Sequence, residues 1–221
     1  RNIMADMNRI FTYLENPLAR TELLKSCTTL MVSPVNMRRE LMALISREIK
    51  HAKNKKVAGI ILKVNSLSDR ALIEKLYEAA KVGVEIKLII RGICCMFTES
   101  KKFHPPVQAI SIIDEYLEHA RVMVFENEGR QKVFITSADW MVRNIDHRIE
   151  VACPVADKEL KQEIIDTINI QLRDNTKARI LDNDLSNRYV IPGTAVKIRS
   201  QIEIFNYLSK KTGFRQSNIM L

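Results

Sequence analysis

Cysteine is scarce in this sequence, and its pattern excludes two classes of protein. The 221 residues include four cysteines, Cys27, Cys94, Cys95 and Cys153, and none of them forms a Cys-x-x-Cys pair. This usage does not fit the disulfide framework of a small secreted domain, and it gives no support to a cysteine-ligated zinc site. We therefore expect the chain to work in a reducing compartment.

Long apolar runs are also missing. No uninterrupted stretch reaches the roughly 20 residues that a membrane-spanning helix needs, and no apolar signal-peptide core is present. Low-complexity segments and short-period repeats are absent, while apolar residues make up 46% of the composition, so the sequence predicts a folded globular protein. The chain opens at Arg1 without a methionine, from which we expect a piece of a longer protein.

Acidic residues are outnumbered by basic ones. The chain carries 35 Lys and Arg against 26 Asp and Glu, a formal net charge of +9. Such a surplus fits either an ordinary solvated surface or a surface that attracts polyanions such as nucleic acid, polyphosphate or an anionic membrane. The basic residues are spread along the chain rather than gathered in one tail, which disfavours a simple nucleic-acid-binding arm.

Apolar strand patterns alternate with amphipathic helix patterns in the first half of the chain. Such a βαβαβ order is typical of a mainly parallel sheet covered by helices. Asn36 and Ser68 or Asp69 are suitable N-caps, and Gly83 is a suitable left-handed stop after the second helix. The predicted elements are strands at 30–32, 57–64 and 84–90 and helices at about 36–54 and 69–82.

The second half predicts antiparallel pairing. A strand that begins at His119 returns through a turn into 132–136, so the sheet is expected to be mixed overall. Further strands are predicted at 109–113 and 148–153, and amphipathic helices at 160–172 and 198–208. The predicted fold is therefore α/β, with a mixed, mainly parallel sheet flanked by helices. We expect residues 30–221 to form this domain and residues 1–29 to be the tail of a preceding one.

The candidate site centres on His119 and Arg121. Alternation along a strand places both side chains on one face, where an imidazole can move a proton while a guanidinium holds an anionic oxygen. Arg91 ends the earlier strand, followed by Gly92, where the carboxyl ends of strands in open α/β sheets bind ligands. An anchoring salt bridge is an equally good interpretation of Arg91. We expect a site that handles phosphate.

Polar side chains after the returning strand support this site. Trp140 is interpreted as a packing anchor of their loop. Glu150 shares a strand face with Arg148, and either a salt bridge that orients Arg143 or His119 or a purely structural pair would explain it. The supporting residues are Arg121, Ser137, Asp139, Arg143 and Asn144.

The His119-x-Arg121 strand and the Ser137–Trp140 loop resemble the half-motif of phospholipase D-like proteins. That family uses His-x-Lys plus a downstream polar residue, with two halves facing each other across one site. Here an arginine replaces the lysine, and Asp139 stands where an asparagine is usual, so phosphodiesterase chemistry is disfavoured. A phosphodiesterase or nuclease half-site acting as a homodimer is kept as the alternative, and a non-enzymatic polyanion-binding module as a third hypothesis.

Longer motifs resemble the carboxyl-terminal region of bacterial polyphosphate kinases, from about Asn8 to Phe214. The opening Ile10–Pro17 is similar to the tail of the preceding domain in that family. The other motifs are Ser33-Pro34-Val35-Asn36-Met37-Arg38, Asn65-Ser66-Leu67, Arg91-Gly92-Ile93-Cys94, Glu118-His119-Ala120-Arg121, Phe125-Glu126-Asn127, Ser137-Ala138-Asp139-Trp140-Met141, Arg143-Asn144 and Leu185-Ser186-Asn187-Arg188-Tyr189-Val190.

The resemblance implies reversible transfer of the terminal phosphate of ATP to inorganic polyphosphate, through a phosphohistidine in a preceding domain that is not in this chain. It implies that Arg91 binds a nucleotide phosphate and that His119 is catalytic, as a general acid toward the leaving ADP. It also implies Mg²⁺ with no ligands in this chain and self-association of the whole enzyme. Partners would be ATP, ADP and polyphosphate, with no specific nucleic acid. The expected location is the cytoplasm, either free or at the periphery of the inner membrane, and the chain alone is expected to be inactive.

Overall fold

A computed structural model describes residues 3–16, 21–191 and 196–213 of the chain. Pro17 ends the motif Ile10–Pro17 and Phe214 ends the region of family resemblance, and both residues lie outside these ranges. The helices are α1 (Ile3–Glu15), α2 (Glu22–Lys25), α3 (Met37–Lys53), α4 (Arg70–Lys81), the 3-10 helix η1 (Asn127–Gly129), the π-helix η2 (Arg143–His147), α5 (Lys158–Leu172) and α6 (Ser200–Thr212). The strands are β1 (Met31–Ser33), β2 (Gly59–Val64), β3 (Glu85–Ile90), β4 (Gln108–Ile112), β5 (Val122–Phe125), β6 (Lys132–Thr136), β7 (Glu150–Pro154) and β8 (Ala178–Ile180).

The strands form one mixed sheet in the order β1-β7-β6-β5-β2-β3-β4-β8. The prediction of a mixed sheet is confirmed, but the prediction that it is mainly parallel is wrong. Only β2 with β3 and β3 with β4 pair in parallel, and every other neighbouring pair is antiparallel. One physical reason is that parallel neighbours need a long crossover, whereas β5 and β6 are joined only by residues 126–131, which is too short for one.

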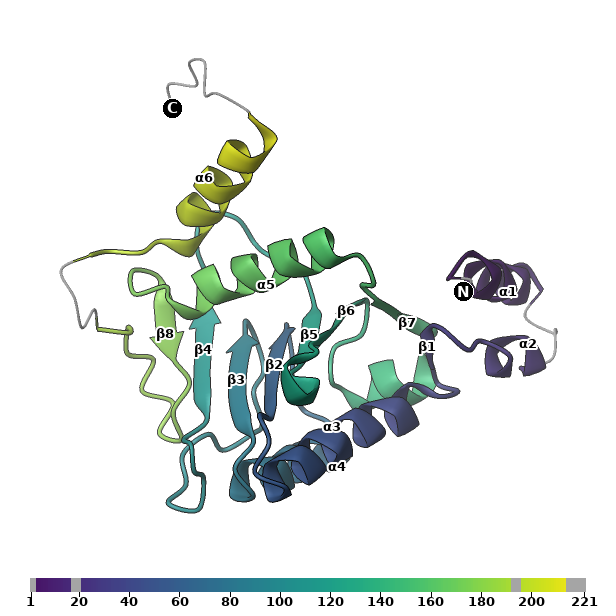
Figure 1. Ribbon diagram of the computed structural model, residues 1–221, viewed down its shortest axis with the longest axis horizontal. Coiled ribbons are helices and arrows are strands. Elements are labelled where there is room, and N and C mark those ends of the chain that lie inside the picture. The colour runs from purple at the N-terminus through teal and green to yellow at the C-terminus, as the bar shows by residue number, and fades with distance from the viewer. Residues whose placement is uncertain (1–2, 17–20, 192–195, 214–221) are drawn as a thin grey trace.

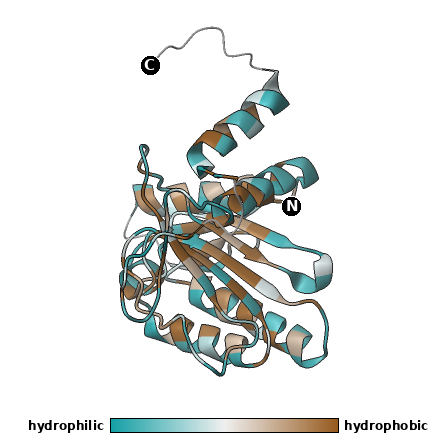
Figure 2. Ribbon diagram, turned by 90° about the vertical axis from the view of Figure 1, so that its left-hand side faces the viewer, coloured by the Kyte–Doolittle hydropathy of each residue, from teal (hydrophilic) through white to brown (hydrophobic). Residues whose placement is uncertain are grey.

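Helices cover both faces of this sheet (Figure 1). Side chains that alternate along the strands face α3 and α4 on one side, where the largest apolar cluster includes Leu62, Ile90 and Phe125. The other face packs against α5 through a second cluster that includes Ile89 and Val124. Figure 2 shows mostly hydrophobic, brown strands running between helices in which brown and teal residues alternate. The sheet is therefore the middle layer of a three-layer core.

The residues predicted to begin or end helices have different outcomes in the structure. Asp69 caps α4 as predicted, because its carboxylate accepts a hydrogen bond from the Leu72 amide at 3.0 Å. Gly83 follows α4 with φ of +100°, which is the left-handed conformation expected of it. Asn36 stands at the N-cap position of α3 but does not cap it, since its Oδ1 accepts from the Val32 amide at 2.6 Å instead. That side chain holds the turn between β1 and α3.

The N-terminal helices lie against the edge of the sheet formed by β1 and β7 (Figure 1). Ile10 and Leu24 pack in a third apolar cluster with Val32 of β1. Asp6 is 1% exposed and accepts hydrogen bonds from the backbone amides of Thr29 and Leu30 at 2.7 and 3.0 Å. Residues 3–16 and 21–29 are thus packed onto the domain, and their assignment to a preceding domain stays a prediction.

Strand β5 begins at Val122, three residues later than predicted from the sequence. The last paired residues are Lys63 of β2 and Val122, so His119 and Arg121 lie just before the ladder. The backbone amides of Asn65 and Ser66 follow β2 directly. They do not extend its pairing with β5, because both donate hydrogen bonds to the Asp139 carboxylate. A distant side chain therefore decides where this strand starts.

Candidate functional site

Segments that are far apart in the sequence meet at one end of the central strands of the sheet. The carboxyl ends of β2 and β3, the start of β5 and the loop after β6 all lie there, because β5 runs antiparallel to β2 and β6 antiparallel to β5. Backbone hydrogen bonds tie them together: the Gly92 amide donates to the Asn65 carbonyl at 2.8 Å, and the Trp140 amide to the Ser66 carbonyl at 3.1 Å. These segments thus form one connected platform.

Gly92 has a steric role in this platform. A Cβ at this position would lie 3.0 Å from the Asn65 carbonyl oxygen, which is closer than nearly all real Cβ contacts. The contact in the structure is with the end of β2, so glycine is needed here for the close approach of two strand ends.

Asp139 joins the platform to the start of β5. Its Oδ1 accepts from Arg121 Nε at 2.9 Å and its Oδ2 from Arg121 Nη2 at 3.1 Å. The same carboxylate accepts from the Asn65 and Ser66 amides at 2.7 and 3.1 Å. Burial raises the pKa of Asp139, but these hydrogen bonds outweigh it and hold the pKa below its ordinary value. Asp139 is therefore the ionised partner of Arg121.

His119 is exposed and is contacted by Arg121. The guanidinium Nη2 lies 3.5 Å from His119 Nε2, and Nη1 donates to the His119 carbonyl at 3.3 Å. The sequence predicted that both side chains approach one place, and they do. Arg121 does so with its charge already paired by Asp139, so it orients the histidine and its loop rather than offering a free cation.

Arg91 lies on the other side of the sheet from Arg121. It follows Ile89 toward α5, where it lines a narrow hollow with Lys63 and Gln171, whereas Arg121 follows Met123 toward α3 and α4. Within the described part of the chain, no hydrogen bond or ion pair joins Arg91 to His119. The buried Nη1 of Arg91 has no hydrogen-bond partner there either. A buried donor without a partner is costly, and such donors often mark a ligand site.

Ser137 and Asn144 both contact Glu150. Asn144 Nδ2 donates to Glu150 Oε1 at 2.6 Å, and the Ser137 hydroxyl bonds to the other carboxylate oxygen. Both predicted partnerships of Glu150, with Arg148 and with Arg143 or His119, are therefore wrong. Glu150 is 9% exposed, and a buried carboxylate needs partners inside the fold, whereas Arg143 and Arg148 are exposed on the surface.

The remaining predicted residues have separate places. Arg143 begins the π-helix η2, exposed, and its guanidinium makes no hydrogen bond or ion pair within the residues that the structure describes. Trp140 is 1% exposed and packs in the main core, which confirms that it anchors the loop. The π-helix and the short strand β8 gave no recognised signal in the sequence.

A largely buried ion pair next to His119, between Lys63 and Glu118, was not predicted from the sequence. Lys63 is 8% exposed, and its Nζ bonds to the Glu118 carboxylate and to Gln171 Oε1 of α5, the latter at 2.9 Å. Glu118 loses part of its hydration, which raises its pKa, but Lys63 and the surrounding donors lower the pKa below its usual range. A lysine inside an apolar strand could have signalled this group, since a buried lysine needs an anionic partner.

A second missed group surrounds Arg38. Its guanidinium bonds to the Asp69 carboxylate at 2.6 and 2.9 Å and to the Asp146 carboxylate at 2.6 and 2.8 Å. These pairs raise the pKa of Arg38 further. The arginine thereby ties α3 to the N-terminus of α4 and to η2.

The described residues contain neither a cluster of metal-ligating side chains nor a helix that could span a membrane. Among the residues that the structure describes, no three His, Cys, Asp or Glu side chains are grouped so that they could share a metal ion. None of the helices in the described ranges combines the length and the apolar character that a bilayer crossing requires.

The sheet and its two helix layers match a known fold. The phospholipase D family member Nuc from Salmonella typhimurium aligns with a TM-score of 0.50 at 13% identity, over 70% of this chain and 97% of that chain. The fold is therefore of the phospholipase D type. The crystal structure of polyphosphate kinase from Porphyromonas gingivalis aligns with a TM-score of 0.90 at 40% identity, over 97% of this chain and 32% of that chain.

Sequence comparison gives the family. The model of the polyphosphate kinase C-terminal domain 2 matches residues 30–201. The polyphosphate kinase of Vibrio cholerae is 48% identical over 208 residues, which is 94% of this chain and 29% of that protein. That of Escherichia coli K12 is 45% identical over 206 residues, or 93% of this chain and 29% of that protein. The chain belongs to the polyphosphate kinase C-terminal domain 2 family, and it spans less than a third of the relatives that it matches.

Proposed function

We propose that this chain supplies one half of the phosphoryl-transfer site of a longer polyphosphate kinase. In the proposed reaction the terminal phosphate of ATP passes to a histidine in another domain and then to the end of a polyphosphate chain, and both transfers are reversible. Family membership and the kinase names of relatives at 48% and 45% identity support the reaction class. The single observation in this chain that favours a phosphate ligand is the buried, unpartnered Nη1 of Arg91 among the described residues.

Each proposed role follows from the chemistry of the group. The planar guanidinium of Arg91 offers paired donors that match phosphate oxygens and balance their charge. The imidazole of His119 can hold or release a proton near neutral pH, which suits a general acid toward the oxygen of the leaving ADP. Arg121 contacts His119 and is itself held by Asp139, and the exposed Arg143 is placed to meet a substrate anion. Ser137 and Asn144 contribute indirectly, by holding Glu150 beneath the loop.

The substrates and setting belong to the same proposal. ATP, ADP and polyphosphate are the proposed partners, and no specific nucleic acid partner is expected. The whole enzyme is expected to self-associate. The Mg²⁺ of the reaction is proposed to be held by another domain and by the substrate phosphates, and the described residues group no three metal-ligating side chains. The isolated chain is expected to make no polyphosphate. A cytoplasmic location, either free or at the inner membrane surface, stays a prediction.

The phosphodiesterase alternative has no observation in its favour beyond the fold. It would need a free cation beside the histidine, in the place of the usual lysine. Arg121 occupies that position, but Asp139 binds its guanidinium with both carboxylate oxygens. A half-site of this kind is poorly suited to stabilise a phosphodiester transition state by that residue.

The test is substitution in the full-length enzyme. We expect His119→Ala to lower the rate of polyphosphate synthesis by about 10²–10⁴-fold, which is typical for loss of a general acid. Arg91→Gln is expected to raise the KM for ATP as well, because a phosphate ligand contributes to binding. Turnover is measured with labelled ATP, and His104→Ala serves as the control because His104 is an exposed histidine in a distant loop. Near-normal turnover of the His119 variant would contradict the proposed role.

A further inference from the structure

The segment that carries His119 lies outside the sheet. Residues 113–121 connect β4 to β5 without belonging to a helix or strand, and most of them are exposed. Arg121 and Asp139 fix only the end of this segment. An exposed, irregular connection is mobile unless other contacts order it. What holds the rest of segment 113–121 therefore decides how well the imidazole is placed.

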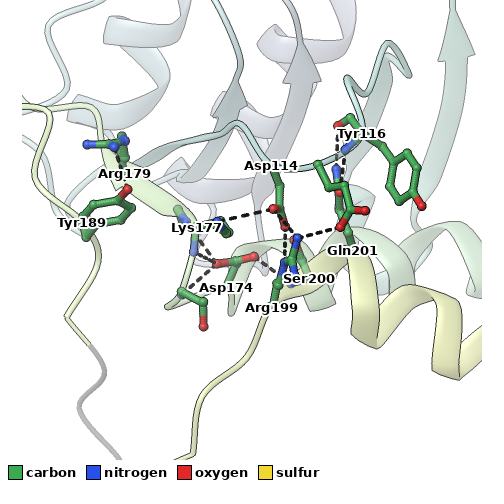
Figure 3. Close-up of polar contacts among 12 residues, drawn as sticks. Asp114, Tyr116, Asp174, Lys177, Arg179, Tyr189, Arg199, Ser200 and Gln201 are labelled. Carbon is green, nitrogen blue, oxygen red and sulfur yellow. Dashed lines mark hydrogen bonds and ion pairs between the residues drawn. The ribbon is translucent and has the colours of Figure 1, made fainter. Parts of the chain in front are cut away.

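Arg199, at the start of α6, holds the beginning of the segment. Its Nε and Nη2 donate to the two carboxylate oxygens of Asp114, both at 2.8 Å, and Nη2 also donates to Glu115 at 3.0 Å (Figure 3). The Asp114 side chain is 1% exposed, and Lys177 lies 3.7 Å from it on the other side. The Arg199 guanidinium is the main cause that keeps the pKa of Asp114 below its usual range. This is a paired, two-oxygen ion pair of the strong kind.

Gln201 holds the middle of the segment. Its Oε1 accepts from the Tyr116 amide at 3.0 Å, and its Nε2 donates to the Tyr116 carbonyl at 2.7 Å (Figure 3). Nε2 also donates to Glu118 at 3.2 Å, immediately before His119 in the chain. One amide side chain thus satisfies both backbone groups of Tyr116, as a neighbouring strand would, and reaches the residue next to the histidine.

The start of α6 is itself firmly anchored. The Asp174 carboxylate, 1% exposed, accepts from the Ser200 amide at 2.7 Å and from the Lys177 and Ala178 amides at 2.7 and 3.0 Å. These contacts join α6 to the beginning of β8. By contrast, the apolar side chains Ile202 and Phe205 farther along α6 remain 46% and 47% exposed. The first turn of α6 thus has buried polar anchors, and Tyr207 and Lys211 farther along the helix bond to Asp166 and Glu163 of α5.

We propose that Arg199 and Gln201 are positioning residues for His119. By holding segment 113–121 at Asp114, Tyr116 and Glu118, they place the imidazole at the platform edge before substrate arrives. The proposal rests on the function proposed for His119. It assigns α6 a part in the reaction although none of its described residues contacts His119 or Arg91 through a hydrogen bond or ion pair.

The experiment uses the full-length enzyme with Arg199→Gln and Gln201→Ala, singly and combined. Hydrogen exchange of the peptides that cover residues 113–121 is measured by mass spectrometry, together with kcat, the KM for ATP and the melting temperature. Arg173→Gln and Gln162→Ala are matched controls, because those side chains bond within α5 or at its end and do not touch the segment. The double variant is expected to exchange faster in segment 113–121 alone and to lose roughly 10- to 100-fold in kcat, since misplacement by about 1 Å has such effects.

The outcomes separate this proposal from the function on which it rests. A selective kcat loss with a KM within about twofold of the parent and an unchanged melting temperature supports positioning. Unchanged exchange and kcat in the double variant, while His119→Ala abolishes turnover, would overturn the positioning role and leave the proposed function standing. Faster exchange throughout the protein with a lowered melting temperature would overturn it in favour of a general stabilising role. Full turnover of His119→Ala would remove both.

Discussion

Asp139 and Arg121 form the ion pair that distinguishes this chain from the usual phospholipase D pattern at the level of single residues. Their side chains are 10% and 13% exposed, and the carboxylate also holds the two amides beyond β2. Removing one partner of a nearly buried pair leaves the other charge poorly solvated. The pair therefore contributes both to stability and to the placement of His119.

Replacing the pair by the usual asparagine and lysine tests this coupling. Asp139→Asn is expected to destabilise the protein by about 3 kcal/mol, because Arg121 loses one of its two acceptor oxygens and the negative charge that neutralises it. The double variant Arg121→Lys/Asp139→Asn should cost less than the sum of the single changes by at least about 1 kcal/mol. Urea unfolding measures these differences, with Arg148→Lys as an exposed control expected to stay within about 0.5 kcal/mol of the parent. Additive costs would contradict direct coupling.

The helices illustrate how an element depends on its cap and on what the cap contacts. Asp157 caps α5 by accepting from the Glu159 and Leu160 amides, each at 2.9 Å, at an exposed position. Asp69 caps α4 and is also bound by Arg38, which holds Asp146 as well. The same residue type thus performs a local role in one helix and joins three segments in the other.

Alanine at the two caps should therefore have unequal costs. Asp157→Ala removes a cap only, and we expect a loss of about 1 kcal/mol. Asp69→Ala also deprives Arg38 of one of its two carboxylates, so we expect a loss of at least about 2 kcal/mol. The free energies of unfolding from urea titrations give the comparison. Equal losses would show that the Arg38 contacts add nothing to the cap.

The whole molecule should be acid-labile. Among the described residues, eight carboxyl groups have pKa values below their ordinary ones because ion pairs and hydrogen bonds favour the charged form: Asp6, Asp114, Glu118, Glu128, Asp139, Asp146, Asp174 and Asp182. A group with a lowered folded-state pKa contributes stability that is present above its unfolded pKa of about 4 and is lost as the pH falls through the folded value. Only Glu48 acts in the opposite sense within the described residues, because burial raises its pKa.

The free energy of unfolding is therefore expected to be nearly constant from about pH 7 to 5 and to fall steadily below about pH 4. Urea midpoints across this range measure it. Asp174→Asn should flatten the acid slope while lowering stability at neutral pH, because it removes one of the groups with a lowered pKa. Midpoints that stay constant or rise down to about pH 3 would contradict the assignment of these pKa directions.

Patterns between chain neighbours predicted much of the fold and suggested the candidate site residues. Strand 132–136 and the caps at Asp69 and Gly83 were predicted correctly, because periodicity, caps and turn residues act over a few positions. The ordered motifs around His119 and Arg91 gave the family, which the comparisons confirm. The chemical roles of these residues stay predictions.

Contacts between distant segments were not predictable in the same way. The antiparallel partners of β5, the pairing of Asp139 with Arg121, the partners of Glu150 and the hold of α6 on segment 113–121 each join residues that no local pattern connects. The sequence by itself determined most of the helices and strands and which family the chain belongs to. Only the tertiary structure decided which charges neutralise one another and on which side of the sheet Arg91 and Arg121 lie, because burial and pairing depend on the packing of the whole chain.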